Sequence, residues 1–306
     1  MADRNEIGTK LLACMMFIPG TSADRLDTLG DAVVPALILD LEDTVAPERH
    51  DEARAEVVRA LAGRVISGDT HVRVNRVGTV AGWLDLLAAV RPGLAGIVLP
   101  KVESAWEIKA ADWVIGSLEA ERSLQPGAIE LMGTIETSRG VRAVGSIARA
   151  SSRLRRLCFG SGDFSADLGL PTSHMQGTRV AAVEAAMQNV VFASAAAGLQ
   201  PPHDGVYPLL TDDDGLAREV ERSVSMGFWG KHTLTSRQTA VVLATLSRVL
   251  PRREVAEHRL QRYDAALRLG EGVSELDGWF VNNTDAERVR ATLRMWESLG
   301  EARVDG

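Results

Sequence analysis

The stretch Glu130-Leu-Met-Gly-Thr-Ile-Glu-Thr137 is a short apolar run that stops at small residues and one carboxylate, Glu136. The stretch Phe159-Gly-Ser-Gly-Asp-Phe164 has the same form and ends with Asp163. Short apolar runs bounded by turn residues are typical of buried parallel strands. Ligands of parallel sheets bind outside the carboxyl ends of the strands. If the two runs are consecutive parallel strands, Glu136 and Asp163 project from the same edge of one sheet.

Six further apolar runs occur at fairly regular intervals, and helical patterns lie between most of them. The eight predicted strands are 11–18, 36–39, 71–74, 96–99, 130–135, 157–159, 204–207 and 227–231. The helical patterns include 53–61, 83–90, 106–121, 140–150, 177–197 and 216–225. Eight strands that alternate with helices predict an α/β fold, the parallel (β/α)8 TIM barrel.

A doubly wound open sheet is the alternative fold, but the first strand-to-helix turn lacks the Gly-x-Gly-x-x-Gly fingerprint of that class. The pattern changes at Pro251, after which residues 254–269 and 285–299 predict helices and 270–278 predict a loop. We therefore expect a barrel domain over residues 1–250 and a C-terminal helical extension over residues 251–306.

The composition is that of an ordinary soluble protein, with 45% hydrophobic and 25% charged residues. The net charge of −7 argues against a nucleic-acid or anionic-membrane surface. Cys14 and Cys158 both lie in apolar runs, which predicts small core residues in a reducing compartment. Because the chain is polar until Leu11, we expect neither a signal peptide nor a membrane span, and we place the protein in the cytoplasm.

Polar residues stand at the predicted carboxyl ends of the strands, where the chemistry of a TIM barrel is located. Glu136 and Asp163 could bind Mg²⁺, or Mn²⁺ in its place, with waters and substrate oxygens as further ligands. The alternative is that each carboxylate caps the helix that follows it. Gly133 and Gly162 beside them are expected to contact substrate, because glycine lets the backbone approach a ligand closely.

Three further polar residues at the strand ends are candidate catalytic groups. The planar guanidinium of Arg73 suits bidentate binding of a carboxylate or a polarised carbonyl. Its alternative is a partner for the acidic residues of the Asp40-Leu-Glu-Asp43 stretch. Glu42 and Asp43 could orient metal-bound waters. Alternatively, they cap a helix that starts near Pro47, and we favour this for Asp43.

Lys101 follows Pro100 at a strand end, a position where a Schiff-base lysine could stand. The alternative is a simple ion pair with Glu103 or Glu136. Lys231 is the second candidate for this covalent mechanism. The six histidines contain no His-x-x-x-His pair, so we do not expect a histidine-rich metal site.

Seven short motifs occur in order along nearly the whole chain. They are Phe17-Ile-Pro-Gly20, Asp40-Leu-Glu-Asp-Thr-Val45, Val72-Arg-Val-Asn75, Leu99-Pro-Lys-Val-Glu103, Ile135-Glu-Thr137, Gly162-Asp-Phe164 and Gly227-Phe-Trp-Gly-Lys231. Each motif is weak alone, but the ordered set resembles the citrate lyase beta-subunit group of the HpcH/HpaI aldolase/citrate lyase family. That family also holds malyl-CoA and citramalyl-CoA lyases.

The resemblance implies a (β/α)8 barrel and a Mg²⁺-dependent lyase that cleaves or forms a carbon–carbon bond beside a carboxylate. By the same resemblance, Glu136 and Asp163 are the metal ligands and Arg73 contacts the keto-acid part of the substrate. The substrate is expected to be a keto acid or hydroxy acid, free or as a CoA thioester. The resemblance also implies a homo-oligomer, a trimer or hexamer, in which the C-terminal segment closes over a neighbour's site.

The chain departs from the family's pattern at three places. Ala13 stands where the family has an arginine, and Leu234-Thr-Ser236 stands where it often has Ile-His-Pro. Asn282 stands where the malyl-CoA lyases have an aspartate, and an amide cannot take up a proton as a carboxylate does. These changes keep three alternatives open: a 2-keto acid aldolase without CoA, an acyl-CoA thioesterase and a non-catalytic paralogue.

Overall fold

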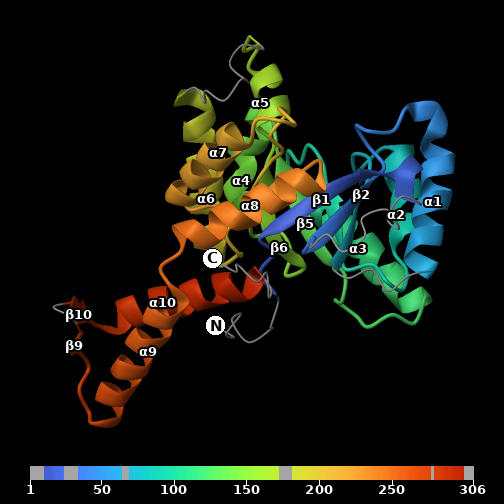
Figure 1. Ribbon diagram of the computed structural model, residues 1–306. Helices are drawn as coiled ribbons and strands as arrows, with labels where there is room; N and C mark the ends of the chain where they lie inside the picture. Colours follow the sequence, from blue (N-terminus) through green and yellow to red (C-terminus); the bar gives the residue numbers. More distant parts are fainter. Residues whose placement is uncertain (1–9, 24–33, 64–68, 172–180, 277–278, 300–306) are drawn as a thin grey trace.

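The computed structural model describes residues 10–23, 34–63, 69–171, 181–276 and 279–299. Eight parallel strands pair in chain order and close into a barrel, in which β8 pairs with β1 (Figure 1). The strands are β1 (Cys14–Pro19), β2 (Ala36–Asp40), β3 (Asp69–Arg73), β4 (Gly96–Leu99), β5 (Glu130–Ile135), β6 (Leu154–Phe159), β7 (His203–Asp204) and β8 (Lys231–Thr233). The predicted TIM barrel is confirmed, and the open-sheet alternative is wrong.

The helices that alternate with these strands begin at sequence signals that are easy to identify. Threonine side chains at Thr79, Thr137 and Thr235 accept the backbone N–H three residues later and cap three of the helices. The elements are η3 (Pro47–Arg49), α1 (His50–Gly63), α2 (Val80–Ala89), α3 (Ala105–Glu121), α4 (Ser138–Ile147), α5 (Ser161–Asp167), α6 (Ala181–Ala197), α7 (Asp213–Met226) and α8 (Ser236–Val249). The helical ranges predicted from the sequence do not include α5 or α8.

The barrel interior is built in layers, because alternate side chains of each strand point inward. One layer is apolar and contains Met15, Ile38, Val98, Met132 and Cys158, all buried. Such a layer supports the site above it, since a close-packed interior leaves the side chains little room to move.

A charged layer lies one step nearer the amino ends of the strands. Arg156 donates to both carboxylate oxygens of Glu130, at 2.7 and 3.3 Å. His71 Nε2 lies 2.8 Å from the same carboxylate. Gly96 makes this possible, because a Cβ at that position would clash with both His71 and Glu130. The floor of the barrel is therefore held by a hydrogen-bonded ion pair as well as by apolar packing.

The last two strands differ from the sequence-based prediction. We predicted 227–231, but β8 is Lys231–Thr233, because Gly227 ends α7 in the left-handed region and Gly230 makes a turn with φ of 118°. Likewise β7 is His203–Asp204 and begins before the predicted 204–207. The shift matters because it puts His232 inside a barrel strand.

The C-terminal extension consists of α9 (Arg253–Arg268), β9 (Ser274–Leu276), β10 (Trp279–Val281) and α10 (Asn283–Ser298). The strand β9 lies within the predicted loop 270–278 and pairs antiparallel with β10, which follows that loop. In Figure 1 these elements reach away from the barrel, and α10 returns toward it. Trp229 Nε1 donates to Ser298 Oγ at 3.0 Å and anchors that return. None of the helices in the described residues is both long and apolar enough to span a membrane.

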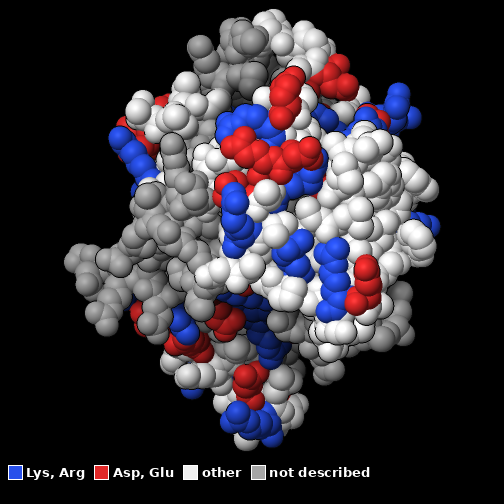
Figure 2. All heavy atoms as spheres, turned by 90° about the vertical axis from the view of Figure 1, so that its right-hand side faces the viewer, with Lys and Arg blue, Asp and Glu red and all other residues white. Residues whose placement is uncertain are grey.

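The surface on the side of α1 carries acidic and basic side chains next to one another (Figure 2). Arg49 pairs with Glu52 at 2.6 Å, and Arg54 pairs with Asp51 at 2.5 Å. Exposed pairs of this kind contribute little to stability, because water screens the charges and the side chains lose freedom.

Candidate active site

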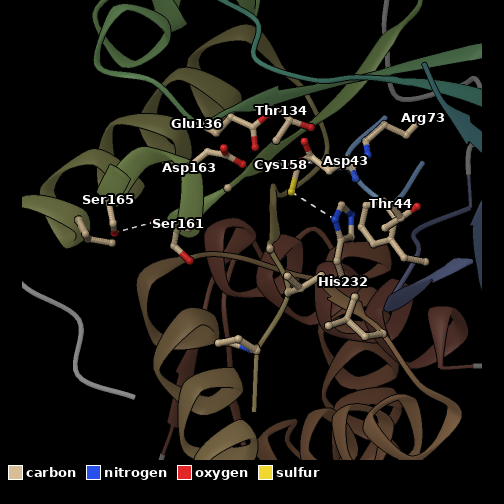
Figure 3. Close-up of a pocket in the computed structure, with 18 of the residues that line it drawn as sticks. Asp43, Thr44, Arg73, Thr134, Glu136, Cys158, Ser161, Asp163, Ser165 and His232 are labelled. Atoms are coloured by element: carbon tan, nitrogen blue, oxygen red, sulfur yellow. Dashed lines mark hydrogen bonds and ion pairs between the residues drawn. The ribbon is translucent and has the colours of Figure 1, made fainter. Parts of the chain in front are cut away.

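A cavity of about 280 Å³ opens at the carboxyl ends of the barrel strands (Figure 3). Its lining side chains come from widely separated parts of the sequence, and the fold brings them together. Among them are Phe17, Arg73, Glu136, Asp163, Cys158 and His232. Catalytic residues of TIM barrels lie at this face, so the cavity is the natural candidate for the active site.

Glu136 and Asp163 lie at the same rim of the barrel, as predicted. Strands β5 and β6 pair in parallel with Ile135 opposite Phe159, so the residues after them face the same cavity. The helix-cap alternative is wrong for both carboxylates. Thr137 caps α4, and Gly160 is the N-cap of α5 without any side-chain cap bond.

The Glu136 carboxylate is held in a tight cradle and is only 3% exposed. Its Oε1 accepts the backbone N–H of Lys101 at 2.7 Å. Lys101 has a φ of 47°, an unfavourable left-handed conformation for a residue with a side chain. The other oxygen, Oε2, lies beside Gly160, where any Cβ would approach it closer than 3.0 Å. Backbone strain and a glycine thus both fix the position of this one carboxylate.

The electrostatics of the rim favour an additional cation. Among the described residues, five carboxylates gather around two cationic side chains, Arg73 and Lys101; the five are Asp40, Glu42, Asp43, Glu136 and Asp163. Burial and then the negative charge of Asp163 raise the pKa of Glu136 to about 7. A divalent cation between the two carboxylates would offset both effects.

The donor set fits Mg²⁺. This hard ion is held in proteins by one or two carboxylates, with waters and substrate oxygens filling the remaining positions. Within the described residues, His, Cys, Asp and Glu form no group of three or more able to hold a metal ion. Glu136 and Asp163 would therefore hold the ion as a pair and leave its other positions to water and substrate.

Arg73 makes a bidentate ion pair with Asp40, its direct neighbour in the register of β2 and β3. The two contacts are 2.6 Å from Nε and 2.8 Å from Nη2. Burial alone would raise the pKa of the Asp40 carboxyl group. The guanidinium of Arg73 outweighs burial and keeps that pKa below its usual value. The predicted alternative for Arg73 is thus confirmed. Its Nη1 points to Glu42, 3.3 Å away, and its guanidinium lies over the Phe17 ring.

Lys101 forms ion pairs with acidic residues at the rim of the barrel. Its Nζ donates to Glu42 at 2.5 Å and to Asp43 at 3.3 Å, and it lies 3.9 Å from Asp163. Burial would lower the pKa of Lys101, but the bond to Glu42 and the nearby carboxylates outweigh it and raise the pKa. A protonated amine is a poor Schiff-base nucleophile. Asp43 is not a helix cap, since η3 begins after Ala46.

Several residues named from the sequence do not line this cavity. Glu42 and Lys101 are among them, although each forms an ion pair with a residue that does. Lys231 is 2% exposed and donates to Asp204 and Glu219, so it is a buried ion-pair partner. Gly133 faces the outside of the barrel, where a Cβ would lie 3.4 Å from the Ile108 side chain. Gly162, in contrast, does line the cavity. Asn282 caps α10 by accepting the backbone N–H of Asp285 at 3.1 Å.

Several cavity residues are not among those predicted from the sequence. Thr134 and Gly160 line the cavity beside Glu136, and alternation along their strands could have identified them. Cys158 is buried as predicted, yet it also borders the cavity. His232 was not predicted as a cavity residue, because the predicted strand 227–231 ends before it. A strand placed at other residues has different side chains on its inner face.

Comparisons with known proteins place this architecture in a family. Residues 13–236 match the HpcH/HpaI aldolase/citrate lyase family, and the chain belongs to it. It is 29% identical to the citrate lyase subunit beta of Haemophilus influenzae, over 94% of this chain and 98% of that one. It is 32% identical to the (3S)-malyl-CoA thioesterase of Cereibacter sphaeroides, over 95% and 96%.

A solved structure shows the same fold. The citrate lyase beta subunit from Mycobacterium tuberculosis, complexed with oxaloacetate and magnesium, superposes with a TM-score of 0.63. The two proteins are 25% identical, and the match covers 76% of this chain and 96% of that one. The barrel and the family assignment therefore agree.

Proposed function

We propose that the protein is a Mg²⁺-dependent carbon–carbon lyase acting on a hydroxy-acyl-CoA or a related hydroxy acid. The observation that carries the proposal is the fixed carboxylate pair, Glu136 and Asp163, in a rim with excess negative charge beside Arg73. Family relatives support the class of reaction, since they include a citrate lyase subunit, and a solved relative is complexed with magnesium and oxaloacetate.

The chain's own residues have distinct tasks in this proposal. Glu136 and Asp163 hold the ion, which supplies a Lewis acid for negative charge that develops on a substrate oxygen. Arg73 borders the same cavity, and the charge of its guanidinium would attract the carboxylate of the acid. Lys101 holds Glu136 through its backbone N–H and orients Glu42 and Asp43 through its ammonium group.

The direct test is turnover of malyl-, citramalyl- and citryl-CoA thioesters with Mg²⁺ and after chelation. We expect Mg²⁺-dependent release of a keto acid and a shorter acyl product. Glu136→Ala should lose both Mg²⁺ binding, measured by calorimetry, and turnover. If Glu136→Ala binds Mg²⁺ and turns substrate over like the wild type, the proposal is wrong.

Thioester hydrolysis is the second candidate function. It is favoured by Asn282, which replaces the expected proton-accepting aspartate, and by the similarity to a malyl-CoA thioesterase. Both reactions need the same carboxylate pair, but their products differ. Hydrolysis leaves the carbon skeleton of the acid uncleaved, so mass spectrometry of the products separates the two functions. Recovery of intact hydroxy acid as the main product would replace the lyase by the thioesterase.

We also propose that the protein is a homo-oligomer, a trimer or hexamer, in the cytoplasm. The extension α9–β9–β10 reaches away from its own barrel (Figure 1), which leaves α9, β9 and β10 free to cover a neighbour's site. Both cysteines, Cys14 and Cys158, are free and buried, as suits a reducing compartment. Sedimentation velocity should show one species larger than a monomer, and a monomer at all concentrations would exclude this arrangement.

A further inference from the structure

Cys158 and His232 form a polar pair directly below the carboxylate rim. Cys158 lies in β6 and His232 in β8, and the two side chains meet inside the barrel across β7. The distance from Cys158 Sγ to His232 Nδ1 is 3.4 Å (Figure 3). Both side chains line the same cavity as Glu136 and Arg73, although the His232 side chain is almost fully buried.

The proton positions of this pair follow from its surroundings. Burial, followed by the charges of Glu136 and Asp204, raises the pKa of the Cys158 thiol, so the thiol keeps its proton. Burial and then the cations Lys231 and Arg73 lower the pKa of His232 to about 3, so the imidazole is neutral. Because a thiol sulfur is a much weaker acceptor than an imidazole nitrogen, we assign the thiol proton as the donor to Nδ1, and the imidazole proton to Nε2.

His232 Nε2 then carries an N–H for which the described residues supply no acceptor. Its aromatic neighbour Phe17 packs against the ring at a centroid distance of 5.5 Å and offers no lone pair. Buried donors without acceptors are rare in folded proteins, and each calls for an explanation. Because the imidazole borders the cavity, an oxygen of a bound ligand is the natural acceptor.

We propose that His232 is a specificity-determining residue, whose Nε2–H donates a hydrogen bond to an oxygen of the bound acid while Cys158 holds the ring. The inference rests on the proposed function and deepens it. The hydrogen bond from His232 selects acids that carry a second oxygen-bearing group, such as a dicarboxylic keto acid, over acids that end in a methyl group. Sites built to hydrogen-bond a substrate group reject analogues that lack it.

The test is calorimetric binding of oxaloacetate and pyruvate to the protein in the presence of Mg²⁺. We expect the wild type to prefer oxaloacetate, and His232→Leu to lose about tenfold in its affinity for oxaloacetate while pyruvate changes little. His232→Gln keeps a donor at a similar distance and should retain most of the preference. Cys158→Ser should also retain it, whereas Cys158→Ala frees the ring and should weaken it.

His203 provides the matched control, since it is equally buried and adjacent to His232 but does not line the cavity. His203→Gln should leave the ratio of the two affinities unchanged. If folded His232→Leu binds Mg²⁺ and keeps the wild-type preference, this inference is overturned while the proposed lyase function stands. If His232→Leu does not fold, an unchanged preference in Cys158→Ala overturns it. If the wild type with Mg²⁺ binds neither acid, the proposed function fails as well.

Discussion

Gly160 leaves space for the carboxylate of Glu136, and adding a single methyl group at Gly160 tests whether that space is needed. In Gly160→Ala the added Cβ would clash with Glu136 Oε2, although the φ of −92° is open to alanine. The carboxylate must move, so we expect at least a tenfold loss of Mg²⁺ affinity by calorimetry. Gly63→Ala, which meets nothing within 4 Å, is the control and should bind Mg²⁺ normally. If Gly160→Ala binds Mg²⁺ as tightly as the wild type, the space at Gly160 is not needed to position Glu136.

Arg73 has a structural task as well as a proposed role in binding. Asp40 is fully buried, so Arg73→Ala leaves it as an uncompensated charge. Breaking a buried pair in this way costs about 3–5 kcal/mol, and we expect a loss of that size in the free energy of unfolding measured with urea. Arg49→Ala removes an exposed pair and should change the same quantity very little. Equal effects of the two substitutions would show that the Arg73–Asp40 pair does not support the fold.

At the scale of elements, β3, β5 and β6 share the buried ion pair below the site. The charge of Arg156 and the contact with His71 outweigh the effect of burial and lower the pKa of Glu130 from 4.5 to about 2. A carboxylate with a lowered pKa in the folded state stabilises the protein above pH 4.5, and this contribution is lost as the pH falls toward 2. Its full size is roughly 3 kcal/mol by linkage.

Glu130→Gln tests this pH dependence. Measured by urea unfolding between pH 6 and pH 3, the wild type should lose stability more steeply than Glu130→Gln. The exposed Glu52→Gln is the control and should keep the steep wild-type slope, because its carboxylate has only an exposed partner. Parallel curves for wild type and Glu130→Gln would mean that the pair does not contribute to acid sensitivity.

The strands that could be predicted are those whose apolar sequence pattern matches their burial in the structure. The strands 96–99 and 130–135 were predicted at their observed bounds, because short, mostly apolar segments bounded by turn residues favour a buried strand. The strand at 227–231 was wrong because Gly227 and Gly230 adopt left-handed turns, which place two large buried residues, Phe228 and Trp229, in a loop. The pair β9–β10 was missed because each strand is only three residues long.

The same reasoning explains what was predictable in the site. Glu136 and Asp163 follow the ends of two adjacent strands, so sequence order alone places them at one rim. Whether Arg73 faces substrate or Asp40 depends on the register of β2 and β3, which the sequence does not state. The contact between Cys158 and His232 crosses β7 inside the barrel, and such a contact exists only once the barrel closes.

For the whole molecule, residue 282 of the C-terminal extension tests the proposed covering of a neighbour's site. Asn282 begins α10 with a reciprocal cap, in which Asp285 also accepts the backbone N–H of Asn282 at 3.3 Å. Asparagine and aspartate are equally good N-cap residues. The cap therefore does not explain why the chain has an amide here, and Asn282→Asp can be made without loss of the local structure.

We predict that Asn282→Asp increases lyase turnover at least tenfold, because a neighbour's site would gain a carboxylate as proton acceptor, and general bases contribute about 10²–10⁴-fold. The melting temperature should stay unchanged. In the pH–rate profile, turnover should fall as the pH drops below the pKa of a carboxylate. The increase in turnover should disappear when the protein is diluted to monomers. Asn283→Asp adds the same charge at the next, exposed residue and should change none of these readouts. If both substitutions act alike, or if the gain persists in the monomer, position 282 does not serve a neighbouring site.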